Sequence, residues 1–295
     1  MNRKRFALFG NIHQAKKSSS IRTLISVLEQ RGTDILIDRP FYDYLTTTLG
    51  FEIHPAALID NNDFEADVVV SMGGDGTFLE AASRVRNKEI PILGINTGRL
   101  GFLADVPADE VECAVEDILS DQCFTERHSL LEVSMEGADP EVYPYALNEV
   151  AVLKRDNSSM ISIEVEINQQ RLTTYQADGL IISTPTGSTG YALSVGGPIV
   201  MPQCQVIGLN AVAPHSLNVR PIVLPDTVEV RLHVRSRNHQ FLIAVDGRSQ
   251  ACDEHVSLTL RRAPYDIHVL KRAGTSPFST LRSKLMWGSD YRNNE

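Results

Sequence analysis

The chain has 295 residues, enough for two domains of ordinary size, and its 42% hydrophobic and 22% charged residues are typical of a globular protein with a sizeable core. The formal net charge of −9 argues against a general affinity for nucleic acid or an acidic membrane surface, so we expect small-molecule partners, no nucleic acid and no membrane. The four cysteines are scattered, which argues against a zinc site or a disulfide framework and favours a reducing compartment. The apolar stretch after the basic N-terminus is too short for a signal peptide, so we expect a cytoplasmic protein.

The first 125 residues alternate between short apolar strands and amphipathic helices. The expected elements are a strand at 6–9, a helix through 21–28, strands at 35–37 and 68–70, a helix at 77–85, a strand at 90–95 and a helix at 109–119. The 25 or so residues after 37 give no clear pattern. Because strands that alternate with helices pair in parallel, residues 1–125 predict an α/β domain with a parallel, Rossmann-like sheet.

From about residue 126 the apolar pattern changes to strand-like alternation. Residues 161–167 and 228–234 alternate strictly, and further strands are expected at 130–133, 146–153, 180–183, 241–245, 256–260 and 267–270. Residues 126–270 therefore predict a mainly antiparallel, β-rich domain. The tail 271–295 has helix-spaced apolar residues at 278–287, which predict a C-terminal helix that packs back on the body, on the first domain.

A glycine turn joins the strand at 68–70 to the helix that follows it. Gly73, Gly74 and Gly76 allow backbone N–H groups to approach a ligand, and the N-terminus of the next helix attracts anions. Phosphates repel the carboxylate of Asp75, which therefore suits a base, or a hold on a sugar hydroxyl or a metal. The alternative is a strand-to-helix loop in which Asp75 caps the helix.

Two common nucleotide motifs are missing from the sequence. No Gly-Lys pair occurs, which excludes a Walker A loop, and Leu79 stands where a dinucleotide fingerprint needs its third glycine. The loop 96–103 follows the strand at 90–95. Its two glycines suggest a tight loop at the same sheet edge as Asp75, although a connector with a buried Phe102 is an equal alternative.

A second dense stretch, residues 178–198, runs from an apolar strand into a loop of hydroxyls and glycines. Hydroxyl and N–H groups suit base edges, ribose and phosphate, and Tyr191 offers a face for stacking; the alternative is a polar turn with a buried tyrosine. Asn148-Glu149 interrupts an apolar strand, so one of the two side chains should point toward a core or a site unless the pair marks an edge strand. Asp246-Gly247 alone predicts a hairpin turn.

The motifs at 73–77 (GGDGT), 148–149 (NE) and 184–191 (TPTGSTGY) together resemble the NAD kinase family, in order and in spacing. The resemblance extends through 96–103 and 196–198 to the tail at 278–287, and so covers most of the chain. Lipid kinases of the diacylglycerol and sphingosine type and phosphofructokinases share turns like the first motif. A lipid or sugar kinase is therefore a second hypothesis, and a non-catalytic NAD(P)-binding regulator a third; the 184–189 run discriminates in favour of the first.

The resemblance implies transfer of the γ-phosphoryl group of ATP to the 2′-hydroxyl of the adenosine ribose of NAD, which gives NADP and ADP. It implies a divalent metal cofactor, with Mg²⁺ expected and its ligands unidentified, and a homo-oligomer, either dimer or tetramer. Asp75 would be the general base, and the amides of Gly73, Gly74 and Gly76 would approach the phosphates. The site is expected in the cleft between the two domains.

The resemblance also implies which residues bind the dinucleotide. Asn148 and Glu149 would bind its ribose and adenine region, and Asp178 its nicotinamide end, in this family often across a subunit interface. The remaining residues expected at the adenosine pocket are Thr186, Ser188, Thr189, Gly190, Tyr191, Ala192, Leu193 and Ser194.

Four further positions qualify this assignment. Asp246 stands in a later Asp-Gly position of the family, near the nucleotides, and Arg248 after it would either meet a phosphate or face solvent. Gln176 occupies a position that bears on acceptance of NADH. Gly190 stands where the family usually has alanine, which removes one methyl group and loosens the backbone.

Overall fold

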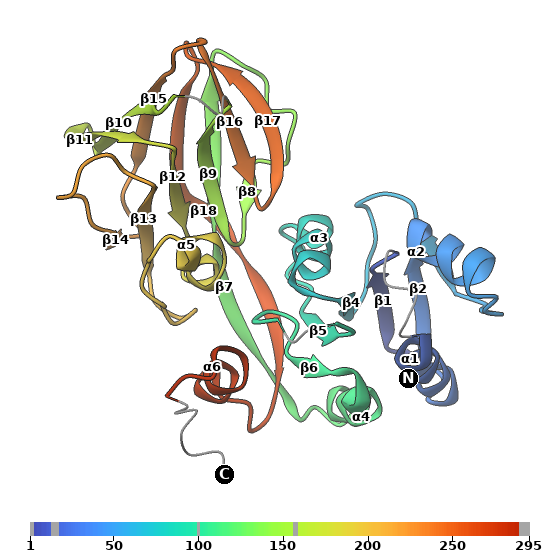
Figure 1. Ribbon diagram of the computed structural model, residues 1–295. Coiled ribbons are helices and arrows are strands. Elements are labelled where there is room, and N and C mark those ends of the chain that lie inside the picture. Colours follow the sequence, from blue (N-terminus) through green and yellow to red (C-terminus); the bar gives the residue numbers. More distant parts are fainter. Residues whose placement is uncertain (1–2, 13–17, 99–100, 156–158, 289–295) are drawn as a thin grey trace. The chain divides into compact units, whose positions relative to one another are not determined.

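The computed structural model describes residues 3–12, 18–98, 101–155 and 159–288, and the chain forms two compact units. The first unit combines Met1–Glu126 with Ile267–Glu295, and the second is Arg127–Asp266. The chain leaves the first unit within strand β7 (Cys123–Glu136) and returns to it within strand β18 (Ser257–Arg272), as Figure 1 shows.

The first unit is built on a parallel sheet with the strand order β3-β2-β1-β4-β5. Its strands are β1 (Arg5–Gly10), β2 (Asp34–Asp38), β3 (Ala57–Ile59), β4 (Val68–Gly73) and β5 (Ile92–Asn96), with the short β6 (Val106–Pro107) beside β5. The end of β18 also pairs with β5 in parallel, where Val269 faces Ile92. This confirms the predicted parallel sheet.

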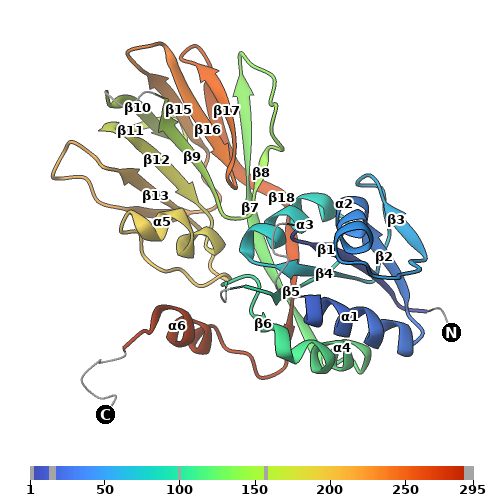
Figure 2. The same ribbon diagram turned by 45° about the vertical axis from the view of Figure 1, so that its right-hand side comes forward.

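Helices cover both faces of the parallel sheet. Helices α1 (Ser18–Gln30) and α4 (Val111–Leu119) lie together on one face, and α3 (Asp75–Val85) lies on the other (Figures 1 and 2). The region after β2, which lacks a clear sequence pattern, forms the short helices α2 (Arg39–Asp43) and η2 (Tyr44–Thr48) before β3. No helix within the described ranges is both long and apolar enough to cross a membrane.

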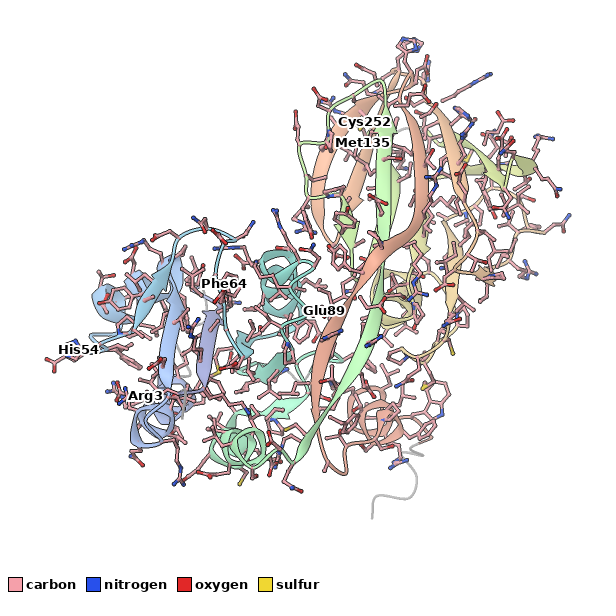
Figure 3. The ribbon with its side chains drawn as sticks, turned by 180° about the vertical axis from the view of Figure 1, so that it is seen from behind. Arg3, His54, Phe64, Glu89, Met135 and Cys252 are labelled. Atoms are coloured by element: carbon pink, nitrogen blue, oxygen red, sulfur yellow. The ribbon has the colours of Figure 1, made fainter. Side chains whose placement is uncertain are left out.

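The second unit consists of two antiparallel sheets that share one apolar core. One has the order β11-β10-β15-β18, with β7 next to β18 and β8 next to β7; the other has the order β14-β13-β12-β9-β16-β17. Their remaining bounds are β8 (Tyr145–Ala146), β9 (Glu149–Lys154), β10 (Ile161–Ile167), β11 (Gln170–Ala177), β12 (Gly179–Ser183), β13 (Val206–Val212), β14 (Ile222–Pro225), β15 (Val230–Arg235), β16 (Gln240–Val245) and β17 (Arg248–Asp253). In Figure 3 Met135 and Cys252 mark one end of this core. The predicted antiparallel character is confirmed.

Some strands differ from those expected from the sequence. The stretches 256–260 and 267–270 belong to the single strand β18, which continues through Pro264. Strands β11, β13, β14 and β17 carry weak or mixed apolar patterns and were not predicted. The loop of the hydroxyl-rich stretch forms two short helices, η4 (Thr186–Thr189) and α5 (Tyr191–Ser194).

The tail forms the predicted C-terminal helix, α6 (Pro277–Leu285). It begins after Ser276, whose hydroxyl accepts a hydrogen bond from the backbone N–H of Phe278 (3.3 Å). It ends at Met286, which adopts the left-handed conformation. The ammonium of Lys284 lies 5.0 Å from the ring centre of Phe102, so α6 contacts the loop after β5 in the first unit.

Candidate active site

Backbone N–H groups hold the carboxylate of Asp75 at the start of α3. Its Oδ2 accepts a hydrogen bond from Phe102 N (2.8 Å), and its Oδ1 accepts from Leu103 N (2.9 Å) and Ala104 N (3.0 Å). The side chain makes no capping hydrogen bond to α3, whose N-cap is Gly74, so the helix-cap alternative is wrong. Because an ionised carboxylate can accept about four hydrogen bonds, one direction remains for a further donor.

The loop after β5 is shaped to bring these three N–H groups to Asp75. The buried Asn96 folds the loop: its Nδ2 donates to Ala104 O (3.2 Å) and its Oδ1 accepts from Gly98 N (2.7 Å). A Cβ at Gly101 would lie 1.9 Å from Asp75 Oδ1, so only glycine allows this approach. The loop therefore does lie at the sheet edge that carries Asp75; its residues 99–100 are outside the described ranges.

A pocket of about 480 Å³ opens at the carboxyl ends of β1, β2 and β4, on the glycine turn. It is lined by Gly10, Asn11, Ile12, Asp38, Pro40, Gly74, Gly76, Thr77 and Glu80. Ligands of parallel sheets collect at this edge, and the N-terminus of α3 contributes a positive dipole end. Sequence reasoning missed Asn11, Asp38 and Glu80, although the first two stand directly at strand ends, which was the available signal.

Asp38 is a buried acid at this pocket. Burial raises the pKa of its carboxyl group, and the guanidinium of Arg84 opposes that effect from 3.1 Å. Glu80, also at the pocket, adds a smaller upward effect on the same pKa.

In the second unit the apolar strand breaks between β8 and β9, at Leu147 and Asn148, and Asp246 fixes that break. Asp246 Oδ2 accepts from Leu147 N (2.8 Å), and its Oδ1 accepts from Asn148 N (2.8 Å) and Glu149 N (3.1 Å). Asp246 and Gly247 both have positive φ and join β16 to β17 in a two-residue turn, as the hairpin prediction required. Burial raises the pKa of Asp246, while the three N–H donors and Arg248 lower it.

The hydroxyl-rich loop packs directly on this break. Thr184 N donates to Asn148 O (2.9 Å), and the Thr184 hydroxyl donates to Leu147 O (2.5 Å). A Cβ at Gly187 would lie 2.0 Å from Asn148 O, so the loop could not approach this closely with any other residue there. The sequence predicted both segments as separate candidates, and the fold brings them together.

Two acceptor atoms at the break are buried without a partner. Asn148 Oδ1 and Glu149 Oε2 make no hydrogen bond with any described residue. Buried polar atoms are rarely left unpaired in proteins, so these two atoms mark a place where a ligand can donate hydrogen bonds. Burial raises the pKa of Glu149 to about 7, Asp246 adds to the rise, and a hydrogen bond from the Tyr191 backbone opposes it.

Most hydroxyls of the loop are engaged within the second unit. Their partners are His128 Nδ1 for Thr186 (2.9 Å), the Pro185 carbonyl for Ser188 (2.6 Å), the Thr186 carbonyl for Thr189 (3.2 Å) and the Tyr191 carbonyl for Ser194 (2.7 Å). Ala192 is buried, Leu193 is half-buried, and Tyr191 is 38% exposed. Tyr191 is therefore exposed at the surface of the loop, whereas several hydroxyls form hydrogen bonds within it.

The other predicted residues lie on β11, near β12 and on β17. Gln176 Oε1 accepts from the Ser162 hydroxyl (3.0 Å), and Asp178 Oδ1 forms an ion pair with Lys154 Nζ (2.7 Å). Arg248 is half-buried: its Nε donates to Val245 O (3.2 Å), and its guanidinium lies 5.5 Å from the ring centre of Tyr143. Arg248 thus supports the hairpin that carries Asp246.

Comparisons with known proteins agree on one family. A family model described as the ATP-NAD kinase N-terminal domain matches residues 6–123, and one described as the ATP-NAD kinase C-terminal domain matches residues 147–271. The chain is 55% identical over 288 residues to an NAD kinase of Bacteroides fragilis, covering 98% of this chain and 99% of that one. It is 44% identical over 292 residues to an NAD kinase of Porphyromonas gingivalis, covering 98% and 100%.

Two solved structures have similar folds. An NAD kinase from Archaeoglobus fulgidus in complex with ATP superposes with a TM-score of 0.74 at 26% identity, covering 96% of this chain and 98% of that one. The yeast NADH kinase complexed with NADH superposes with a TM-score of 0.89 at 21% identity, covering 100% and 91%, which is evidence for the fold alone.

The raised pKa of Glu149 predicts a pH-dependent stability that Glu149→Gln removes. The pKa rises from 4.5 to about 7 on folding, so the fold favours the protonated form. This contribution is complete at acidic pH, below the unfolded pKa, and is lost as the pH rises through about 7. Between about pH 5 and pH 8 we expect the wild type to lose on the order of 2 kcal/mol relative to the glutamine variant.

Thermal unfolding across that pH range measures the difference. The exposed Glu136 of the same unit supplies the matched control, because Glu136→Gln removes an acid that is not buried and should follow the wild-type curve. Parallel curves for wild type and Glu149→Gln would contradict the burial of an acidic group at this break.

Proposed function

The chain belongs to the NAD kinase family, a family of phosphotransferases that use ATP, and we propose that it transfers the γ-phosphoryl group of ATP to the 2′-hydroxyl of the adenosine ribose of NAD. The products are NADP and ADP. The observation that carries this proposal is the Asp75 carboxylate, held by three N–H groups with one acceptor direction left over. The lipid-kinase and sugar-kinase hypotheses are set aside, because the family models cover both units.

Asp75 receives the acceptor hydroxyl in this proposal. The 2′-hydroxyl donates a hydrogen bond to the remaining lone pair, and its oxygen forms the new bond to the γ-phosphorus. The bond from that phosphorus to the bridging oxygen breaks, its electron pair stays with ADP, and the hydroxyl proton passes to Asp75. Phosphoryl transfer has a loose transition state that demands little activation of the nucleophile, so fixing the orientation of the hydroxyl is the larger part of this role.

The glycine turn binds the phosphates of ATP. Gly73 ends β4, and Gly74 and Gly76 line the pocket with no side chain between the ligand and the first turn of α3. First-turn N–H groups lack acceptors within the helix, so phosphate oxygens can fill that place. This arrangement supplies the anion contacts that a Walker lysine supplies elsewhere.

The break between β8 and β9 binds the NAD ribose and adenine region. Asn148 Oδ1 and Glu149 Oε2 accept hydrogen bonds from ribose hydroxyls or the adenine amino group, and the ring of the exposed Tyr191 stacks on the base. Asp246 contributes indirectly, because its hydrogen bonds fix the backbone of 147–149. Asp178, paired with Lys154, is the proposed contact for the nicotinamide end.

The residues of the hydroxyl-rich loop mainly determine the shape of the proposed adenosine site. Thr186, Ser188, Thr189 and Ser194 hold the loop, and Gly190, Ala192 and Leu193 form its turns and walls. Gln176 and Arg248 complete the proposed set, the first through its exposed place on β11 and the second through its support of the β16–β17 hairpin.

The divalent metal is proposed to arrive with ATP. Across the described ranges no group of three or more His, Cys, Asp and Glu side chains is arranged to hold a metal ion. Mg²⁺ commonly binds through substrate phosphates and water with one or two carboxylates, and Asp38 and Glu80 are the acids at the pocket that could approach it. The metal would neutralise charge on the transferred phosphoryl group.

The proposal includes a homo-oligomer, dimer or tetramer, in the cytoplasm. Leu217 is 88% exposed and Val223 lies on the outer strand β14, so both are apolar groups that a subunit interface would cover. The four cysteines, all within the described ranges, are free thiols, as a reducing compartment would keep them.

Asp75→Asn tests the role of the carboxylate. The amide keeps the size of the side chain, but it puts an NH2 donor where a carboxylate oxygen accepts from a backbone N–H, and it cannot take a proton. Both the orientation of the hydroxyl and the proton transfer are therefore impaired, and we expect turnover to fall at least about 100-fold while the affinity for NAD changes by only a few-fold. NADP formation from NAD, ATP and Mg²⁺ reports turnover, and calorimetric titration reports binding. The exposed Asp109, changed to asparagine, is the matched control. Turnover of Asp75→Asn within about tenfold of the wild type would contradict this role.

Gly190→Ala tests the contact between the loop and Glu149. A Cβ at Gly190 would lie 2.9 Å from Glu149 Oε2, so this carboxylate must move. We expect KM for NAD to rise roughly threefold to tenfold with little change in kcat, because the added methyl group weakens the binding of NAD in the ground state and in the transition state alike. The double variant with Glu149→Gln should show a non-additive effect on KM; strict additivity would mean that the methyl group acts elsewhere.

A further inference from the structure

Lys284 of α6 is a buried cation that has no role in the mechanism proposed for Asp75. Its Nζ is buried and makes no hydrogen bond to any described residue. The ammonium faces the ring of Phe102 at 5.0 Å, and Phe102 is the residue whose N–H binds Asp75 Oδ2. The helix that carries Lys284 follows β18 through the short connection seen in Figure 2. A chain element from the far end of the sequence thus places a positive charge beside the loop that holds Asp75.

The charged groups around Lys284 come from two other elements and one loop. Asp75 belongs to α3, Asp105 precedes β6, and Lys271 lies on β18. Lys271 and Asp105 form a largely buried ion pair with an Nζ to Oδ2 distance of 2.7 Å, so each partner neutralises the other. Asp75 uses its oxygens for three backbone N–H groups. The ammonium of Lys284 therefore has attractive charges nearby but no oxygen acceptor among the described residues.

A buried ammonium with three unused donors is costly unless an anion binds to it. Burial lowers the pKa of Lys284 to about 8, while Asp75 and Asp105 oppose that effect and Lys271 adds to it. The acceptor hydroxyl meets the γ-phosphoryl group at Asp75, so phosphate oxygens must come close to a carboxylate that repels them. A cation at this place would offset that repulsion.

We propose that Lys284 is a catalytic residue whose ammonium binds an oxygen of the phosphoryl group during its transfer. This inference rests on the proposed function, because it needs the transfer to take place at Asp75. The ammonium keeps its three protons throughout. The phosphorus exchanges its bridging oxygen for the 2′-oxygen as described, and Lys284 stabilises the negative charge spread over the other three oxygens. Lys284 would thus share the task of the missing Walker lysine, from a helix at the opposite end of the chain.

Lys284→Met tests this role, because methionine keeps the apolar stem and removes the charge. Loss of one donor to a transferring group lowers kcat by about 100-fold or more, and we expect that loss with KM for NAD changed by no more than about threefold. Lys284→Arg keeps a cation and should recover kcat to within about tenfold of the wild type. The exposed Arg282 on the same helix gives the matched control, Arg282→Met, which should retain wild-type kcat.

The pH profile separates a catalytic role from a packing role. The wild-type kcat/KM should fall on the alkaline side with a midpoint near the Lys284 pKa of about 8, and Lys284→Arg should abolish that fall because guanidinium stays protonated. Thermal unfolding checks the fold of each variant; if Lys284→Met does not fold, the arginine variant and its profile carry the test. An unchanged alkaline limb in Lys284→Arg, or a folded Lys284→Met with wild-type kcat, would overturn the proposal. A wild-type chain that forms no NADP would instead overturn the proposed function.

Discussion

The hydrogen bonds between Asp75 and the N–H groups of 102–104 are the constraint on which the rest of the first unit depends. They join the first turn of α3 to the loop after β5, and so fix two neighbouring strand ends against each other. The constraint requires glycine at 101 and the buried Asn96, which folds the loop. Because backbone donors orient the carboxylate, its position is set by the sheet itself rather than by flexible side chains.

The second unit uses the same device for a different purpose. Asp246 also accepts three backbone N–H groups, but its side chain is only 4% exposed and its donors belong to the segment 147–149. Asp75 keeps partial exposure and can still accept from a ligand. In the proposed mechanism one carboxylate therefore takes part in the reaction, whereas the other positions Asn148 and Glu149, each of which has a buried side-chain oxygen with no hydrogen-bond partner among the described residues. Two aspartates with similar partners thus differ in role through burial.

Local sequence signals predicted the parts of the fold that have strong periodicity. The glycine turn, the apolar strands around it and the alternating strand β10 gave correct elements, because each carries its pattern within a few residues. Strands such as β11 and β14 were missed, since their burial is partial and depends on neighbours far along the chain.

Long-range contacts set the limit for the candidate site as well. The sequence identifies Asp246 as a hairpin residue. Its hydrogen bonds with the N–H groups of 147–149, about a hundred residues away, depend on the pairing of β16 with β9, which the local sequence does not show. Asp38 belongs to no recognisable sequence motif, and for Lys284 the sequence predicted only that it lies in a C-terminal helix. The residues that surround Asp38 and Lys284 can be identified only from the three-dimensional positions of the strand ends and of the tail helix.

The position of the transferred phosphoryl group is the sharpest test of the proposed mechanism, because it identifies the hydroxyl that Asp75 would receive. Phosphorus NMR of the product made by the wild-type chain from NAD, ATP and Mg²⁺ identifies the esterified carbon through its proton coupling. We expect a single new phosphomonoester on the 2′-carbon of the adenosine ribose, together with ADP. A phosphoryl group on another hydroxyl, or inorganic phosphate with unchanged NAD, would contradict it.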